Sequence, residues 1–349
     1  MLSKKLSFIF IIIAGEAIFM LPFMIPRLYR PLILDAWNLN NTQIGTAFSV
    51  YGLSAMISYL IGGQFADRYH PRVLMSLSLI ITALATSFLI ISPSYIVLIS
   101  TYFFYGISTI LLMWGALIKV THTSGADKDR SSAMGILDAG RGLSAALISS
   151  LLLFITSTMY QSLDTQSLKV EALNTIYITV ILFIIVMACI IWFSLKNFKI
   201  QDTLNNNWTI KEAKVILKNP SVWLLGIVIL SAYCGYKSID NYSVYLVDVH
   251  GQGIVQSSIF TTIIFWLRPI SAFLAGILAD KLHAKIKSGR FIILTILLIL
   301  SAAMQIIMAI NIISIFNIIM MTIIISSALA YALRAIYFSI FGDLNIKET

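Results

Sequence analysis

The chain has 349 residues, of which 59% are hydrophobic and 11% charged, with a net charge of +9 and a mean hydropathy of +0.91. Soluble domains are ~45–50% apolar and ~25% charged, and disordered chains combine few apolar residues with a high net charge, so both classes are excluded. The basic residues lie in short connectors between long apolar runs and form no stripe with interleaved aromatic residues, which argues against nucleic-acid binding. The composition therefore predicts an integral membrane protein.

Ten apolar runs are each long enough to cross a bilayer, because a hydrocarbon core of ~30 Å needs ~20 apolar residues in a helix. The runs do not alternate in polarity as the strands of a membrane barrel would. The first run carries Glu16 and is longer than the ~7–15 apolar residues of a secretory signal. The sequence thus predicts an all-α membrane protein with helices near residues 6–30, 44–66, 73–91, 95–118, 132–157, 174–195, 220–247, 256–279, 291–309 and 312–338.

The connectors predict the orientation and the domain boundaries. Lysine and arginine gather in the connectors on the side of the N-terminus, which favours a cytoplasmic N-terminus. The longest of these connectors, 196–219, carries five lysines and separates six spans from four. We interpret it as a cytoplasmic linker, in preference to a regulatory segment, between an N-terminal six-helix bundle at 1–195 and a C-terminal bundle at 220–349.

One segment of the sequence occurs twice. Gly63–His70, with the sequence GQFADRYH, is matched 213 residues later by Gly276–His283, with the sequence GILADKLH. Each copy ends an apolar run and is followed by a short basic turn. An internal repeat of this kind indicates an architecture built from related units, so we expect two related halves.

The repeated motif, Gly-x-x-Ala-Asp-(Arg/Lys) followed by basic residues between the second and third helices of each half, resembles the loop signature of the major facilitator superfamily. The resemblance covers essentially the whole chain and departs from the usual pattern at His70 and His283, where the family commonly has glycine. It implies a fold of two pseudo-symmetric helical bundles with twelve helices. The repeat offset places the counterpart of the sixth run beyond Thr349, so we expect the eleventh and twelfth helices to be missing and the C-terminal bundle to be truncated.

The resemblance also implies a role for the loop charges, since the loop aspartate of this family commonly braces a cytoplasmic gate. A carboxylate near a helix N-terminus is favoured by ~0.3–1 kcal/mol. A solvated loop charge is the alternative interpretation of each aspartate. The gating residues predicted on this basis are Asp67, Arg68, Arg72, Asp280 and Lys281.

Five basic residues lie inside the predicted spans, where an ionised side chain costs ~2.5–3.5 kcal/mol unless it faces water or a partner. Because arginine's planar fork suits a carboxylate or a phosphate, a positively biased cavity favours an anionic substrate. An ion pair within one helix is the alternative for Arg141 with Asp138 and for Lys237 with Asp240. The predicted substrate-binding residues are Arg27, Arg141, Lys237, Arg268 and Arg334.

Glu16 is the one acidic residue of the first span. A low-dielectric site favours the neutral form of a carboxyl group, so we interpret Glu16 as a candidate for proton coupling. An ion pair with Arg268 or Arg334 is the alternative.

Other chemistries have no support in the sequence. There is no phosphate-binding loop and no Gly-x-Ser-x-Gly elbow. The four histidines lie in different connectors and both cysteines lie in apolar runs, so neither a metal site nor a disulfide framework is predicted. We expect no enzymatic activity, no catalytic residue and no cofactor.

The resemblance implies a secondary active transporter that moves a small organic anion, either a carboxylate or a phosphorylated metabolite, across a bacterial inner membrane by alternating access. Proton symport and antiport both stay open. A weaker similarity in spans 1, 5 and 8 is to bacterial branches that carry organophosphates or nitrate. The expected partners are the anion, H⁺ and the lipid bilayer, with no nucleic acid, and the protein is predicted to be a monomer. The alternative is a non-transporting membrane sensor or an inactive truncated remnant.

Overall fold

A computed structural model describes residues 4–124, 130–159, 165–196, 198, 218–310 and 316–337. Within these ranges, ten helices are long and apolar enough to cross a membrane: Leu6–Ala36, Asn41–Arg68, Pro71–Ile91, Tyr95–Thr121, Ile136–Thr158, Gln166–Ser194, Pro220–Asp248, Ile254–Lys285, Gly289–Ile310 and Asn317–Ile336. They coincide with the ten predicted runs, which confirms the all-α membrane fold. The predicted linker 196–219 lies almost wholly outside the described residues, as does the polar segment 338–349.

The protein divides into two compact units. Unit 1 comprises Met1–Asp202 and Ser243–Thr262, and unit 2 comprises Thr203–Tyr242 and Ile263–Thr349. Residues 243–262, which belong to the second half of the sequence, are thus part of unit 1. One reason is a hydrogen bond in which the Ser258 hydroxyl donates to the Leu28 carbonyl over 3.0 Å. We retain 196–219 as the proposed boundary between the two halves of the sequence.

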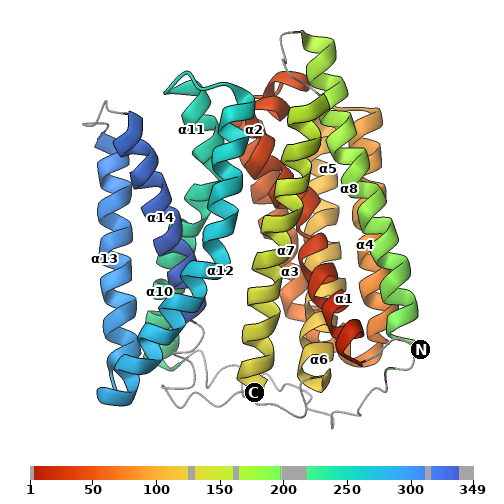
Figure 1. The fold of residues 1–349 in the computed structure, drawn as a ribbon. Coiled ribbons are helices and arrows are strands. Elements are labelled where there is room, and N and C mark those ends of the chain that lie inside the picture. Colours follow the sequence, from red (N-terminus) through yellow and green to blue (C-terminus); the bar gives the residue numbers. More distant parts are fainter. Residues whose placement is uncertain are drawn as a thin grey trace. The chain divides into compact units, whose positions relative to one another are not determined.

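The helices of unit 1 run side by side (Figure 1). In chain order they are α1 (Lys4–Ala17), η1 (Met20–Met24), α2 (Ile25–Ala36), α3 (Asn41–Arg68), α4 (Pro71–Ile91), α5 (Tyr95–Gly106), η2 (Ile107–Trp114), α6 (Gly115–Ser124), α7 (Arg130–Met159), α8 (Gln166–Ser194) and α11 (Tyr242–Asp248), followed by the first turns of α12 (Ile254–Lys285).

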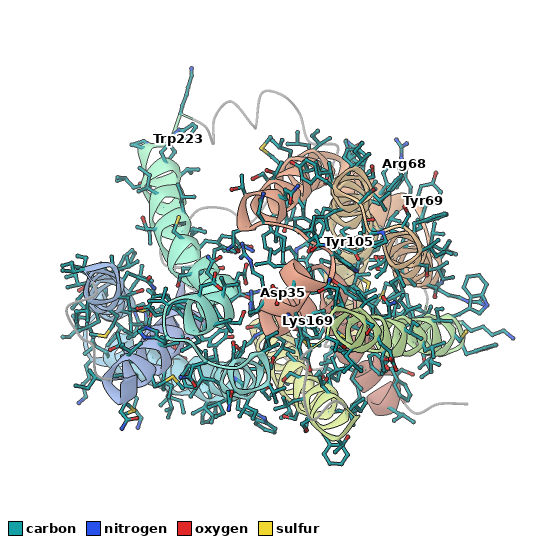
Figure 2. The ribbon with its side chains drawn as sticks, turned by 90° about the horizontal axis from the view of Figure 1, so that it is seen from above. Asp35, Arg68, Tyr69, Tyr105, Lys169 and Trp223 are labelled. Atoms are coloured by element: carbon teal, nitrogen blue, oxygen red, sulfur yellow. The ribbon has the colours of Figure 1, made fainter. Side chains whose placement is uncertain are left out.

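Short polar side chains set where several of these helices begin. The Asn40 side chain accepts the backbone N–H of Gln43, whose own side chain accepts the N–H of Asn40, so α3 starts with a complete capping box. At the start of the connection that leads into α3, Asp35 near the end of α2 pairs with Lys169 near the start of α8 over 2.6 Å. The two residues lie together when the molecule is seen from above (Figure 2). These contacts fix the ends of α2, α3 and α8.

The first and fourth spans are interrupted by the π-helices η1 and η2. Proline has no N–H, so Pro26 leaves the Pro22 carbonyl without its usual helical donor, and the buried Tyr102 hydroxyl donates to that carbonyl over 3.1 Å. In the fourth span the Tyr105 carbonyl accepts the Thr109 hydroxyl over 2.7 Å. Hydroxyl donors thus satisfy backbone groups that a π-helix frees inside a membrane.

The remaining helices form unit 2: α10 (Pro220–Ser238), η3 (Ile239–Asn241), the rest of α12, α13 (Gly289–Ile310) and α14 (Phe316–Ile336). Their apolar core includes Leu225, Leu294 and Leu333. Beyond this core the Gln305 amide donates to the hydroxyls of Ser238 and Ser326, each over 2.9 Å. A small polar network therefore joins α10, α13 and α14 at the point where α10 gives way to the 3₁₀ turn.

Candidate functional site

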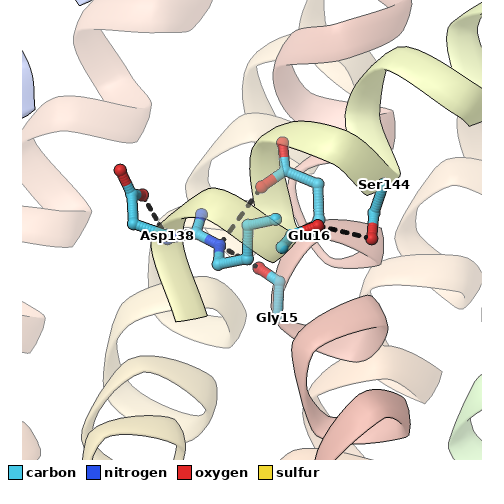
Figure 3. A network of polar contacts seen from close by, with 6 residues as sticks. Gly15, Glu16, Asp138 and Ser144 are labelled. Carbon is cyan, nitrogen blue, oxygen red and sulfur yellow. Dashed lines mark hydrogen bonds and ion pairs between the residues drawn. The ribbon is translucent and has the colours of Figure 1, made fainter. Parts of the chain in front are cut away.

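Arg141 is the centre of a polar network inside unit 1. The residue lies on α7 and is only 4% exposed. Its Nε–H donates to the Gly15 carbonyl over 3.2 Å, and the same nitrogen lies 3.1 Å from Oε2 of Glu16 as an ion pair. On the other side its Nη1 lies 3.8 Å from Oδ1 of Asp138. Gly15, Glu16 and Asp138 are drawn around this side chain in Figure 3.

Two glycines lie where helices approach closely around Arg141: Gly15 lets α1 approach α6, and Gly140 lets α7 approach α1. A Cβ atom placed on Gly15 would lie 2.8 Å from a methyl group of Leu117, and one placed on Gly140 would lie 2.7 Å from a methyl group of Ile12. Both distances are shorter than van der Waals contact. Small residues of this kind let helix backbones approach one another in membranes.

Aromatic rings cover the guanidinium. The Arg141 Cζ atom lies 5.3 Å from the ring centroid of Phe19 and 5.3 Å from that of Trp114, within the range of cation–π attraction. Phe19 immediately precedes η1 and Trp114 is the last residue of η2. The start of η1 and the end of η2 therefore both lie beside Arg141. Since π-helices are frequent at functional sites, their convergence here singles out this network.

The two carboxylates of the network differ in accessibility. The Glu16 side chain is 8% exposed and the Asp138 side chain is 41% exposed. Together they carry one formal negative charge more than the guanidinium that they share. An ion pair as buried as that of Glu16 and Arg141 is costly to break, because removal of one partner leaves a buried charge. The network is therefore accessible on the Asp138 side and closed on the Glu16 side.

The ion-pair partners predicted for Glu16 were Arg268 and Arg334, whereas the structure places Arg141 against it. Glu16 and Arg141 are 125 residues apart in the sequence and lie on different helices, so residue spacing within one helix gives no signal for this pair. The predicted ion pair of Arg141 with Asp138 within α7 is present, and at 3.8 Å it is the longer of the two contacts.

The other four predicted substrate-binding residues differ in their burial and in their contacts. Arg27 is 5% exposed and Arg268 is 6% exposed, so both are buried in the protein, as expected for charges inside spans. Lys237 donates to Asp240 over 2.5 Å, which is the local pair that the spacing indicated. Arg334 is partly exposed, and its Cζ atom lies 4.7 Å from the ring centroid of Tyr236.

The predicted gating charge of unit 1 lies at the helix end that the repeat indicated. The Asp67 carboxylate is 66% exposed and lies 3.4 Å from Nζ of Lys119, which also donates to the Ala66 carbonyl over 3.1 Å. Arg72 stacks its guanidinium 3.8 Å from the ring centroid of Trp192. Arg68 is exposed. Lys119 and Trp192 are partners that sequence reasoning did not name.

The second copy of the motif is arranged differently. Asp280 is 70% exposed and accepts hydrogen bonds from Nε and Nη2 of Arg290 over 3.2 and 2.9 Å. In the first copy α3 ends at Arg68, because Pro71 disfavours helix at His70, the residue before it, which is extended. The second copy has no such proline, and α12 continues to Lys285. Lys281, the counterpart of Arg68, is exposed just before this extension.

Comparison with known proteins identifies the family and the fold of this chain. The model of the Major Facilitator Superfamily matches residues 7–343, so the chain belongs to this superfamily of membrane transporters. Among curated relatives, the inner membrane protein YihN of Escherichia coli (strain K12) is 23% identical, with 100% of this chain and 82% of YihN covered. The inner membrane protein YqcE of the same organism is 24% identical, with 71% of this chain covered.

The matched part of this chain spans 58% of the length of YqcE and 60% of the hexuronate transporter of Bacillus subtilis (strain 168), which is 22% identical over 73% of this chain. A solved bacterial homologue of the human lysosomal transporter Spinster, in an inward-facing and unoccupied conformation, superposes with a TM-score of 0.71. That structure is 17% identical, with 97% of this chain and 74% of the homologue covered. At this identity the likeness concerns the fold alone.

Proposed function

We propose that this protein is a secondary transporter for a small organic anion, with Arg141 as the anion-binding group and Glu16 as the proton-coupling group. The observation that carries the proposal is the buried contact of 3.1 Å between these two side chains, on two different helices. Membership of the superfamily supports transport as the activity. We further propose that the N-terminus is cytoplasmic and that the membrane is a bacterial inner membrane.

The charges of the network suggest how the two roles are coupled. With Glu16 and Asp138 both ionised, the group around Arg141 carries a net negative charge, which opposes the entry of an anion. A proton on Glu16 removes one negative charge and weakens its hold on the guanidinium. Arg141 is then available to a carboxylate that displaces the more distant Asp138 from the exposed side. Proton binding and anion binding would thus favour each other, as symport requires.

The substrate class rests on the basic residues and on one relative. Arg27, Lys237, Arg268 and Arg334 stay proposed substrate contacts, with Arg27 and Arg268 already buried within the protein. A curated relative is named a hexuronate transporter, and a hexuronate is a carboxylate. We therefore propose a carboxylate in preference to a phosphorylated metabolite. The residues proposed to form the gate are Asp67, Arg68, Arg72, Asp280 and Lys281.

Reconstituted liposomes test this proposal. We expect counterflow of a radiolabelled hexuronate in the wild-type protein, and net uptake that follows an inward proton gradient. Arg141→Gln is expected to lower both by at least about a hundredfold, on the scale of a lost buried charge contact. Lys169→Gln is the matched control, since it removes a basic residue of an exposed ion pair at a helix end.

A second variant isolates the proton. Glu16→Gln mimics the protonated carboxyl, so counterflow is expected to continue while net uptake no longer responds to the proton gradient. Counterflow and gradient-driven uptake that both match the wild type would contradict the role of Glu16. Anion binding without any counterflow would instead favour the non-transporting sensor that the sequence left as the alternative.

A further inference from the structure

A line of aromatic rings leads away from Arg141 along unit 1. The ring centroids of Trp114 and Phe19 are 6.4 Å apart, those of Phe19 and Phe23 are 6.3 Å apart, and those of Phe23 and Phe48 are 5.8 Å apart. Phe23 also meets the ring of Tyr51 edge to face at 4.7 Å. We refer to these five residues as the aromatic series. They come from three separate spans, so only folding brings them together.

The rings of the aromatic series are intermediate in exposure between the core and the most exposed side chains. All five rings are partly exposed, whereas the neighbouring core residues Tyr102 and Tyr105 are 3% and 1% exposed. Aromatic residues that project fully from their helices are far more open, as at Phe88 and Phe193, which are 67% and 69% exposed. The series therefore keeps part of its ring surface accessible without projecting its rings as fully as Phe88 or Phe193.

Polar groups lie along the aromatic series. The Asp138 carboxylate, which shares Arg141 with the first two rings, is 41% exposed, and an exposed carboxylate inside a span does not face lipid. At the far end Arg30 places its Cζ atom 6.0 Å from the ring centroid of Phe48. Between these ends the Tyr51 hydroxyl bonds to Thr109 over 2.9 Å. Ring faces and polar groups alternate, as in sites that bind small molecules.

We infer that the aromatic series is a subsite that selects a carboxylate carried on a saturated, hydroxylated ring over an acyclic carboxylate. This inference rests on the proposed function, because Arg141 must hold the carboxylate. The negative face of an aromatic ring attracts the weakly positive C–H groups on one face of a saturated ring. The hydroxyl groups on the opposite edge of the ring would donate to the Asp138 carboxylate. An acyclic skeleton pays more conformational entropy to present such a face.

Two probes test the selection directly. Glucuronate in its ring form and gluconate, which is acyclic, each carry one carboxylate on a hydroxylated six-carbon skeleton. Their dissociation constants are measured by calorimetry on the purified full-length protein. We expect the wild type to bind glucuronate about tenfold more tightly than gluconate, which is the scale of one aromatic contact.

The variants separate the aromatic series from the anion site. Phe23→Leu is expected to reduce the preference for glucuronate to about twofold or less while leaving gluconate affinity within about twofold of the wild type. Trp114→Leu is expected to reduce the same preference and, because Trp114 also covers the Arg141 guanidinium, to weaken the binding of both probes. The ring of Phe23 contacts the rings of Phe19, Phe48 and Tyr51. Its substitution therefore leaves in place the rings of Phe19 and Trp114 that contact Arg141. Trp114→Phe keeps a ring and is expected to keep the preference. Phe104→Leu, on the exposed side of α5, is the matched control.

The outcomes distinguish this inference from the proposed function. Equal binding of both probes by the wild type would overturn ring selection and leave anion binding in place. Leucine variants that keep the full preference would also overturn it. If neither probe binds, the proposed function is wrong and ring selection is wrong with it.

Discussion

Two ion pairs inside the predicted spans differ in how their partners are joined. Glu16 and Arg141 lie on α1 and α7, and their side chains are 8% and 5% exposed. Lys237 and Asp240 lie three residues apart in one span, and their side chains are 32% and 5% exposed. The first pair exists only while two helices stay close, whereas the second persists in any arrangement that keeps its own span folded.

This difference explains why we assign coupling to the first pair. A contact between helices can transmit a local change of charge into a change of helix packing, because each partner is anchored on a different element. A contact within one span neutralises two charges and leaves the other helices unaffected.

Arg141→Met is expected to have the largest effect on stability, because it leaves the Glu16 carboxylate buried without its guanidinium. The free energy of unfolding should fall by about 3–5 kcal/mol, as for other buried pairs that lose one partner. The double variant Glu16→Met with Arg141→Met should recover most of this loss. Denaturant titration of the purified protein measures both, and additive losses in the double variant would contradict a coupled pair.

Gly140→Leu tests the approach of α1 and α7 without removing a charge. A side chain there meets the methyl groups of Ile12, so either the Ile12 side chain or the two helices must shift. We expect a loss of about 1–3 kcal/mol in the free energy of unfolding, as for other overpacked sites. Gly52→Leu, at a position with open space around it, is the matched control on another helix. Equal losses in the two variants would show that close approach at Gly140 is not required.

Lys237→Met is expected to cost about 1–2 kcal/mol, because it leaves the buried Asp240 with one hydrogen bond fewer. The lysine is one-third exposed, so water compensates part of the loss. The double variant Lys237→Met with Asp240→Leu should return close to wild-type stability. In the same denaturant titration, a loss as large as that of Arg141→Met would remove the contrast between the two pairs.

Asp280→Asn is expected to have the smallest effect on stability, about 0.2–1 kcal/mol, because its pair with Arg290 is exposed. The effect should decline further as salt is added, since exposed charges are screened. Thermal unfolding at low and high ionic strength measures this dependence. A salt-independent loss would indicate that the pair is buried in the working protein.

The sequence could predict features that depend on composition and on local spacing. Helix length follows from bilayer thickness, so the ten spans could be placed from their apolar residues alone. The repeated motif indicated the superfamily, and the spacing of Lys237 and Asp240 indicated a pair that the structure contains. Each of these features involves residues close in the sequence or a requirement of the membrane itself.

Helix packing determines which distant residues meet, and this packing is visible only in the tertiary structure. Nothing in the sequence joins Glu16 to Arg141, or Trp114 to Phe19, because the partners lie on different helices and helix packing sets their distance. The two copies of the repeat also diverge, since Pro71 ends one helix early and its absence lets α12 continue to Lys285. The physical reason is that the membrane dictates which segments become helices, whereas glycine contacts, ring packing and buried charge dictate how the helices fit together.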